Sequence, residues 1–167
     1  YKFTPKIAVA LDIQRILWNE VPSIGHEGPT ATGPVLGLNP LCPSGSSTPD
    51  CQLGGELGMG FGWRNQTVYK IGLDYKYTPG MNLRAGYNYG KAPIPEDQVL
   101  FNMLAPATTE KHYTLGATLV MDKDSDISVT FMHSPKNVIK GPTMFPGSSA
   151  ALSMSQTSIG IAYGSKF

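Results

Sequence analysis

Apolar and polar residues alternate along six segments of the chain, and this alternation limits the possible folds more than any other feature. The segments span approximately 6–14, 66–77, 82–89, 112–121, 126–132 and 156–167. A period of two residues is the period of a β-strand, in which successive side chains point to opposite faces. We therefore predict an all-β fold of six antiparallel strands, each with one apolar face.

The connections between these strands alternate in length. Short turns at 78–81 and 122–125 alternate with long connections at about 19–65, 92–111 and 134–153. In an antiparallel sheet this order places the long connections at one end and the short turns at the other. Bacterial outer-membrane β-barrels have this arrangement, with short periplasmic turns and long extracellular loops. We therefore expect the long connections to be extracellular and both ends of the chain to be periplasmic.

The positions of the charged residues predict which face of the sheet is outside. The aliphatic face has tyrosines near the strand ends, as the lipid-facing surface of a membrane barrel does. Arg15 shares this outward parity, but it lies near a strand end, where a long side chain reaches the headgroups. A soluble lipid-binding barrel, with its aliphatic face inside, is the alternative. The other charges within the strands lie on the opposite face: Lys6, Asp12, Lys70, Asp74, Lys76 and Arg84.

Six strands are too few to close a membrane barrel, which needs at least about eight. An unpaired strand edge in lipid leaves backbone N–H and C=O groups without hydrogen bonds. We therefore expect residues 1–167 to be the C-terminal part of a single larger β-barrel domain, with the remaining strands as its partner. The lack of an initiator Met or a signal segment at Tyr1 fits a processed or partial product. Assembly from several six-stranded pieces is the alternative.

Composition and motifs argue against several classes of function. A formal charge of +1 lacks the basic footprint of a nucleic-acid-binding protein. No apolar run approaches the roughly 18 residues of a transmembrane helix. The histidines, His26, His112 and His133, have no metal-ligand spacing, so we expect neither a metal nor a cofactor. Ser134 beside His133 is the nearest approach to a nucleophile–base pair, but adjacent strand residues point to opposite faces.

Three motifs together resemble one family of membrane proteins. They are GMGFGWRNQTVYKIGL at 58–73, APIPE at 92–96 and FMH at 131–133, in this order before a terminal Phe167. The chain thus resembles the FadL family of outer-membrane long-chain fatty acid and hydrocarbon transporters. The resemblance implies that the six strands are the C-terminal strands of a barrel of about fourteen.

The same resemblance implies passive uptake of long-chain fatty acids or other hydrophobic compounds, without catalysis. A transporter specific for hydrocarbons, or a barrel enzyme of the lipase or protease type, is the alternative. Phe167 ends an amphipathic strand, as the sorting signal read by the barrel-assembly machinery does. We therefore expect that machinery to be a partner, together with outer-membrane lipid and a hydrophobic ligand.

Basic residues on the inner face are candidates for binding the carboxylate of a fatty acid. Arg64 shares the parity of Lys70, which places both on the inner face. In the resembled family a basic wall residue near this point helps to hold the carboxylate, because an unpaired buried charge is costly. The alternative for Arg64 is an ion pair with a loop acid such as Glu56. Lys70 and Arg84 are weaker candidates, because charges inside a barrel usually neutralise one another. The acids available to these two are Asp12 and Asp74.

Large apolar residues in or beside the long connections are candidates for lining a pocket for an acyl chain. They are Phe61, Trp63, Phe101, Met103 and Leu104. Methionine suits ligands of variable shape because its side chain is flexible and polarisable. Packing of one loop against another, which would cap the barrel, is the alternative role.

Two cysteines, Cys42 and Cys51, lie nine residues apart in a stretch rich in Gly, Pro and Ser. In an oxidising compartment such a pair forms a disulfide bond that closes a loop. Two free thiols are the alternative.

Overall fold

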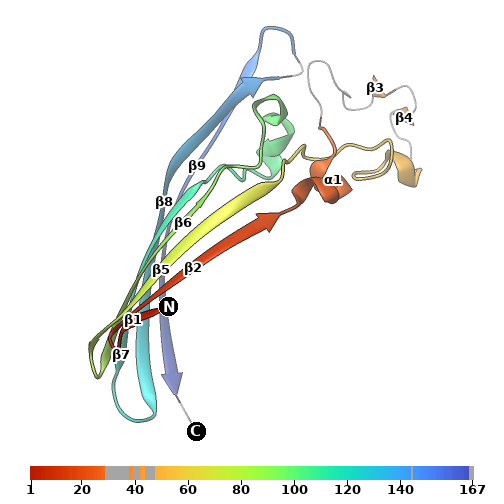
Figure 1. The fold of residues 1–167 in the computed structure, drawn as a ribbon. Coiled ribbons are helices and arrows are strands. Elements are labelled where there is room, and N and C mark those ends of the chain that lie inside the picture. The colour runs from red at the N-terminus through yellow and green to blue at the C-terminus, as the bar shows by residue number, and fades with distance from the viewer. Residues whose placement is uncertain (29–37, 40–41, 44–47, 144, 166–167) are drawn as a thin grey trace.

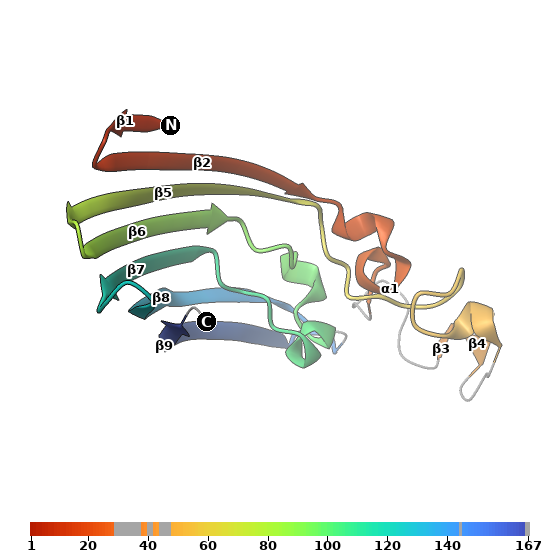
Figure 2. The same ribbon diagram turned by 90° about the horizontal axis from the view of Figure 1, so that it is seen from below.

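The computed structural model describes residues 1–28, 38–39, 42–43, 48–143 and 145–165. Its main element is a curved antiparallel sheet of seven strands in the order β1-β2-β5-β6-β7-β8-β9, whose two end strands do not pair with each other (Figures 1 and 2). The strands are β1 (Lys2–Thr4), β2 (Ile7–Ile16), β5 (Gln66–Thr78), β6 (Met81–Gly90), β7 (Lys111–Val120), β8 (Ser125–Pro142) and β9 (Ser149–Ser165).

The two longest connections contain short elements, gathered at the upper end of the sheet in Figure 1. Between β2 and β5 lie the helices η1 (Trp18–Glu20), α1 (Pro22–Gly25) and η2 (Pro49–Cys51) and the strand pair β3 (Leu38–Asn39) and β4 (Cys42–Pro43). Between β6 and β7 lie η3 (Glu96–Gln98) and η4 (Phe101–Leu104). None of the helices in the described residues is long and apolar enough to cross a membrane.

The six predicted strands are present, and the prediction of an all-antiparallel β architecture is confirmed. The seventh strand, β1, was not predicted, because three residues are too few to establish a period. It pairs with the start of β2 through Lys2–Ala8 and Thr4–Ile7. Phe167, which we predict to be part of a sorting signal, lies outside the described residues.

The third long connection, predicted at about 134–153, is wrong in its extent. β8 continues to Pro142 and β9 starts at Ser149, so only residues 143–148 connect them. The two strands therefore form a long hairpin that rises above the rest of the sheet (Figure 1).

A β-bulge in β8 explains why the sequence pattern concealed this hairpin. Ser134 pairs with Gln156 and Asn137 pairs with Met154, so β8 has two residues between these pairs where β9 has one. The extra residue reverses the parity of β8 beyond this point. The regular alternation therefore stops at Ser134, although the strand does not.

The upper connections pack against one face of the sheet only. Ile94 and Val99, from the connection between β6 and β7, form a buried core with Ile139 of β8 and Leu152 of β9. Leu152 has the parity of the even-numbered residues of β9, which from Gln156 onward are small or polar. The connections thus cover the small and polar face, and the aliphatic face of the sheet points away from them.

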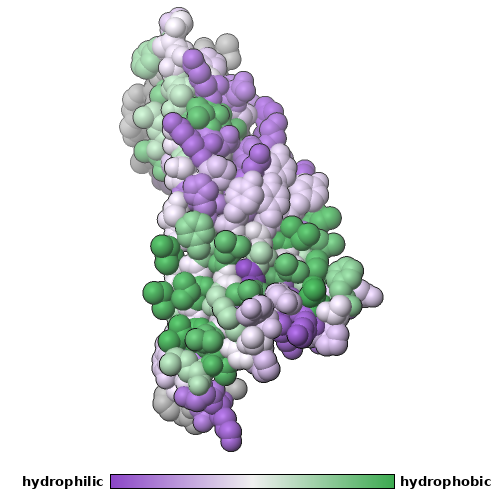
Figure 3. Space-filling model, turned by 90° about the vertical axis from the view of Figure 1, so that its left-hand side faces the viewer, coloured by the Kyte–Doolittle hydropathy of each residue, from purple (hydrophilic) through white to green (hydrophobic). Residues whose placement is uncertain are grey.

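The face that points away from the connections is strongly apolar. Its side chains are exposed, for example Leu115 by 60% and Ile161 by 77%. Figure 3, seen from the left of Figure 1, shows hydrophobic side chains gathered in a band, with hydrophilic side chains above it and at its foot. Exposed apolar surface costs about 25 cal/mol per Å² in water, so this band needs an apolar environment.

The short turns lie at the opposite end of the sheet from the long connections. In the turn between β7 and β8, the backbone N–H of Asp124 donates to the Asp122 carboxylate at 2.9 Å. Hydrogen bonds from the Ser125 hydroxyl and from this N–H hold the pKa of Asp122 below its usual value. The turn is thus stabilised locally, without help from packing.

Gly141 permits the connection between β6 and β7 to approach β8 closely. A Cβ atom at Gly141 would overlap the backbone carbonyl of Glu96. Overpacking of this kind costs roughly 1–3 kcal/mol, so Gly141→Ala should speed amide hydrogen exchange over residues 92–107 by about tenfold or more. The control is Gly72→Ala, since a Cβ there meets only Ala10 Cβ at 3.9 Å. Equal exchange in the two variants would contradict the packing.

Candidate functional site

Four aromatic side chains from the two long connections meet above the inner face of the sheet. Ring centroids lie 5.2 Å apart for Trp18 and Trp63, 4.9 Å for Phe61 and Phe101, and 6.4 Å for Phe61 and Trp63. These separations are typical of favourable aromatic pairs. We call these four residues the aromatic cluster.

A buried asparagine joins the aromatic cluster to the backbone. Trp63 Nε1 donates to Asn102 Oδ1 at 2.6 Å, and Asn102 Nδ2 donates to the carbonyl oxygens of Phe61 at 2.7 Å and Gln98 at 2.8 Å. The Gln98 side chain in turn accepts the Gly28 N–H at 2.6 Å. Asn102 and Gln98 are both buried, so their amides connect the two long connections across a site closed to water.

The structure brings together some of the predicted apolar residues and leaves others apart. Phe61, Trp63 and Phe101 pack against one another, which matches the loop-packing alternative. Met103 and Leu104 are 61% and 75% exposed and take no part in the aromatic cluster. A role in lining a ligand pocket therefore stays a proposal for all five.

Two of the predicted basic residues are neutralised within the sheet. Lys70 Nζ lies 3.0 Å from Asp12 Oδ2, and Arg84 Nε lies 2.9 Å from Asp74 Oδ2. Arg84 also donates to the Thr118 hydroxyl at 2.8 Å. Both pairs are partly exposed, so each contributes little stability. Lys70 and Arg84 thus already have acidic partners, which is the alternative to carboxylate binding that the sequence left open.

Arg64 is in a different situation. Its backbone N–H donates to the Pro93 carbonyl at 2.8 Å, which holds the two long connections side by side. Its exposed side chain lines a cavity of about 880 Å³. Among the carboxylates that the structure describes, none forms an ion pair with Arg64, and the pair with Glu56 is not made.

The cavity beside Arg64 has mixed chemistry. It is lined by equal numbers of basic and acidic residues, by Ile94 of the connection between β6 and β7, and by Tyr69 and Tyr89, whose parity places them on the outward face of the sheet. Its volume is within the usual range for small-molecule sites. An amphipathic ligand would find both a cation and apolar contacts here. The charged lining residues are Arg15, Arg64, Lys91, Glu96, Asp97 and Glu110.

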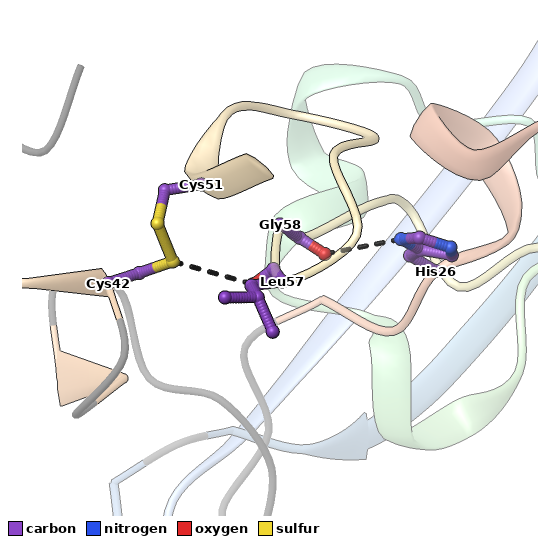
Figure 4. The surroundings of a disulfide bond; sticks show 5 residues. All are labelled: His26, Cys42, Cys51, Leu57 and Gly58. Atoms are coloured by element: carbon purple, nitrogen blue, oxygen red, sulfur yellow. Dashed lines mark hydrogen bonds between the residues drawn. A yellow bond between two sulfur atoms is a disulfide. The ribbon is translucent and has the colours of Figure 1, made fainter. Parts of the chain in front are cut away.

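A disulfide bond joins Cys42 and Cys51, with the Cα atoms 5.5 Å apart (Figure 4). Cys42 Sγ lies 3.9 Å from the carbonyl oxygen of Leu57. His26 Nδ1 lies 3.3 Å from the carbonyl oxygen of Gly58. The His26 contact fixes Gly58 beside the end of α1, and the disulfide lies next to Leu57, shortly before the aromatic cluster in sequence.

The serine and histidine considered for a hydrolytic site are kept apart. His133 is exposed and its Nδ1 lies 2.9 Å from the Thr157 hydroxyl. Ser134 is fully buried on the opposite face, and neither its Oγ nor Nδ1 of His112 has a hydrogen-bond partner. Within the described ranges, no three His, Cys, Asp or Glu side chains are grouped to hold a metal ion.

The residues that organise the long connections were not predicted. Asn102, Gln98 and Trp18 gave no signal, because amides and single aromatic residues are common in loops. Their importance depends on contacts between segments that lie 39 to 70 residues apart, and no local pattern shows such contacts.

An antiparallel sheet with an aliphatic outer face, a small and polar inner face and long connections at one end is the architecture of an outer-membrane β-barrel segment. The family described as outer membrane protein transport protein (OMPP1/FadL/TodX) matches residues 1–167. The chain belongs to this family.

Two solved structures share this fold. The Pseudomonas putida toluene transporter TodX is 21% identical, with a TM-score of 0.59, over 100% of this chain and 32% of that one. The TodX deltaS2S3 mutant, a monoaromatic hydrocarbon channel, is 23% identical, with a TM-score of 0.62, over 100% of this chain and 33% of that one. The chain thus spans about a third of their length. No curated protein matches the sequence.

Asn102→Ala should loosen the aromatic cluster. The substitution leaves the Trp63 indole N–H and two carbonyl groups without partners, and each buried unpaired group costs roughly 1–3 kcal/mol. Tryptophan fluorescence should shift to the red and become more accessible to iodide. Met103→Ala, at an exposed position of the same helix, is the control and should change neither. Unchanged quenching in Asn102→Ala would show that the amide does not hold the cluster.

Reduction of the disulfide should loosen the connection between β2 and β5 without disturbing the sheet. A disulfide that closes a loop of this size contributes on the order of 2–3 kcal/mol. Protease cleavage within residues 48–60 should therefore be faster after reduction, or in a variant with both cysteines changed to Ser. Cleavage within 92–107 is the internal reference. Equal acceleration in both regions would mean that the disulfide supports the whole upper end.

Proposed function

We propose that the protein forms part of an outer-membrane β-barrel that takes up hydrophobic compounds passively. Membership of the transport family and the exposed aliphatic band support this proposal. In a closed barrel, the free edges at β2 and β9 would pair with the remaining strands, because lipid offers no partner for open backbone groups. The long connections would then face the outside of the cell, and Phe167 would serve the barrel-assembly machinery.

Uptake of this kind needs binding and release, without a catalytic group. A hydrophobic molecule would be caught by the long connections and would pass through the cavity beside Arg64. Each buried CH₂ group stabilises the bound ligand by about 0.8 kcal/mol. Chain length would therefore set most of the affinity, and a cation would set the orientation of the ligand.

The guanidinium of Arg64, which forms no ion pair with any carboxylate that the structure describes, is the observation that favours a long-chain fatty acid as substrate. A carboxylate beside this side chain would gain a charge-assisted hydrogen bond. The Lys70 and Arg84 side chains are less suited to this role, since each already has an aspartate partner.

A neutral hydrocarbon is the second candidate substrate. The aromatic cluster supports it, because aromatic side chains pack well against aromatic ligands. The two solved relatives are a toluene transporter and a monoaromatic hydrocarbon channel. For such a ligand the Arg64 cation would contribute nothing.

Arg64→Ala in the complete protein separates the two candidates. Loss of a charged hydrogen bond should weaken binding of a fluorescent fatty acid by roughly 10- to 100-fold, and binding of toluene should not change. The matched control is Arg84→Ala, whose guanidinium is already paired, and it should bind the fatty acid as the wild type does. If Arg64→Ala binds the fatty acid normally, the role of Arg64 is refuted.

A further inference from the structure

The charged side chains on the outward face of the six long strands are all basic. The outward parity of Arg15 is that of Ile13, and the outward parity of Lys111 is that of Leu115. In β8 the bulge reverses the parity, so the even positions 136 and 140 face outward opposite the inward Ile139. The acidic strand residues Asp12, Asp74 and Asp126 all have inward parity. We call the four basic residues the cationic belt: Arg15, Lys111, Lys136 and Lys140.

The strand register places two members of the belt at nearly the same height. Lys111 pairs with Tyr89, and Tyr89 pairs with Tyr69. Arg15 pairs with Thr67, which is two residues from Tyr69. Two residues along a strand span about 7 Å. Measured along the strands, Arg15 and Lys111 therefore differ in height by about one such step. Across the sheet, three strand-to-strand spacings separate them.

The other two members continue the belt upward along β8. His133 pairs with Tyr113, which is two residues from Lys111. Lys136 lies in the bulge, three residues after His133, so it reaches about the height of Lys111 on the neighbouring strand. Lys140 lies four residues further along the protruding hairpin.

The belt lies directly above surface that suits lipid. Moving up the outward face, aliphatic residues such as Leu115 give way to the paired tyrosines Tyr87 and Tyr113, and then to Lys111 at the height of Tyr89. Figure 3 shows the same order, with hydrophilic side chains above the hydrophobic band. Tyrosines anchor at membrane interfaces, and Lys and Arg side chains reach from there to the headgroups. Phosphate groups of lipids lie at this height.

The belt is free to bind an anion. Arg15 donates to the Thr67 hydroxyl at 2.7 Å, and no member of the belt forms an ion pair with any described carboxylate. Glu110, next to Lys111 in sequence, accepts the Ala92 N–H at 3.0 Å. Glu96 and Asp97 line the same cavity as Arg15, but neither forms an ion pair with it. The short-turn end has no such bias, since its turn at 122–124 mixes two acids with one lysine.

We propose that the cationic belt binds the phosphate groups of membrane lipids in the leaflet on the side of the long connections. This rests on the proposed membrane position of the sheet, but it is independent of the transported substrate. In this role the belt fixes the depth of the segment in the membrane and holds the protruding β8–β9 hairpin against the lipid surface.

The complete protein in detergent tests the proposal by native mass spectrometry and titration with phosphorylated lipid A. Lysines near a surface phosphate each contribute about 1 kcal/mol, so the variant K111Q/K136Q/K140Q should bind roughly 100-fold more weakly. The corresponding triple Lys→Arg variant keeps the charge and should bind as the wild type does. Removal of the phosphate groups from lipid A should weaken its binding to the wild type. The loss of affinity should equal that caused by K111Q/K136Q/K140Q with phosphorylated lipid A.

The matched control is K2Q/K6Q/K123Q, which removes three lysines near the short-turn end and should leave lipid binding unchanged. Fatty acid and toluene binding should be normal in both triple variants, which separates this proposal from that for Arg64. Equal affinity for the two forms of lipid A, or unchanged binding by K111Q/K136Q/K140Q, would overturn the proposal. Inorganic phosphate should displace the lipid no more than NaCl of equal ionic strength does. Greater displacement by phosphate would also overturn the proposal, because the belt would then be a site for free phosphate.

Discussion

Hydrogen bonding between neighbouring strand backbones is the constraint on which the rest of the structure depends. The ladders fix the register, and the register decides which side chains lie opposite each other. Asp12 is the direct partner of Lys70, and Asp74 is the direct partner of Arg84. Both ion pairs follow from the ladders, and so does the separation of an aliphatic face from a small and polar one.

Local sequence patterns were sufficient for the strands and for the polarity of the two faces. Each strand carries its own period, and the period survives because one face meets the long connections and the other does not. Alternation could not reveal β1, which has three residues, or the upper part of β8, where the bulge interrupts the pattern. The same alternation did predict the two acids that pair with Lys70 and Arg84, because all four residues have the same parity.

The upper end was much harder to predict, because its structure depends on contacts between distant segments. Trp63 and Phe101 are apolar residues in loops, and both pack against Phe61. The Asn102 amide joins the two connections at this point. Arg64 and Arg84 look alike in sequence, yet Arg84 pairs with Asp74 and none of the described carboxylates pairs with Arg64. That difference is a property of the assembled cavity, and it is the reason why Arg64 is the residue of interest.

The bulge at residues 135–136 links the length of β8 to the direction in which its tip faces. If β8 kept the same number of residues but continued beyond Ser134 without the bulge, Ile139 and Lys140 would exchange sides. The hydrophobic anchor of the loops would then lie against the membrane, and an ammonium group would lie beneath the loops. The direction in which the tip faces therefore depends on the number of residues that the bulge adds to β8. Substitution of a single side chain leaves that number unchanged.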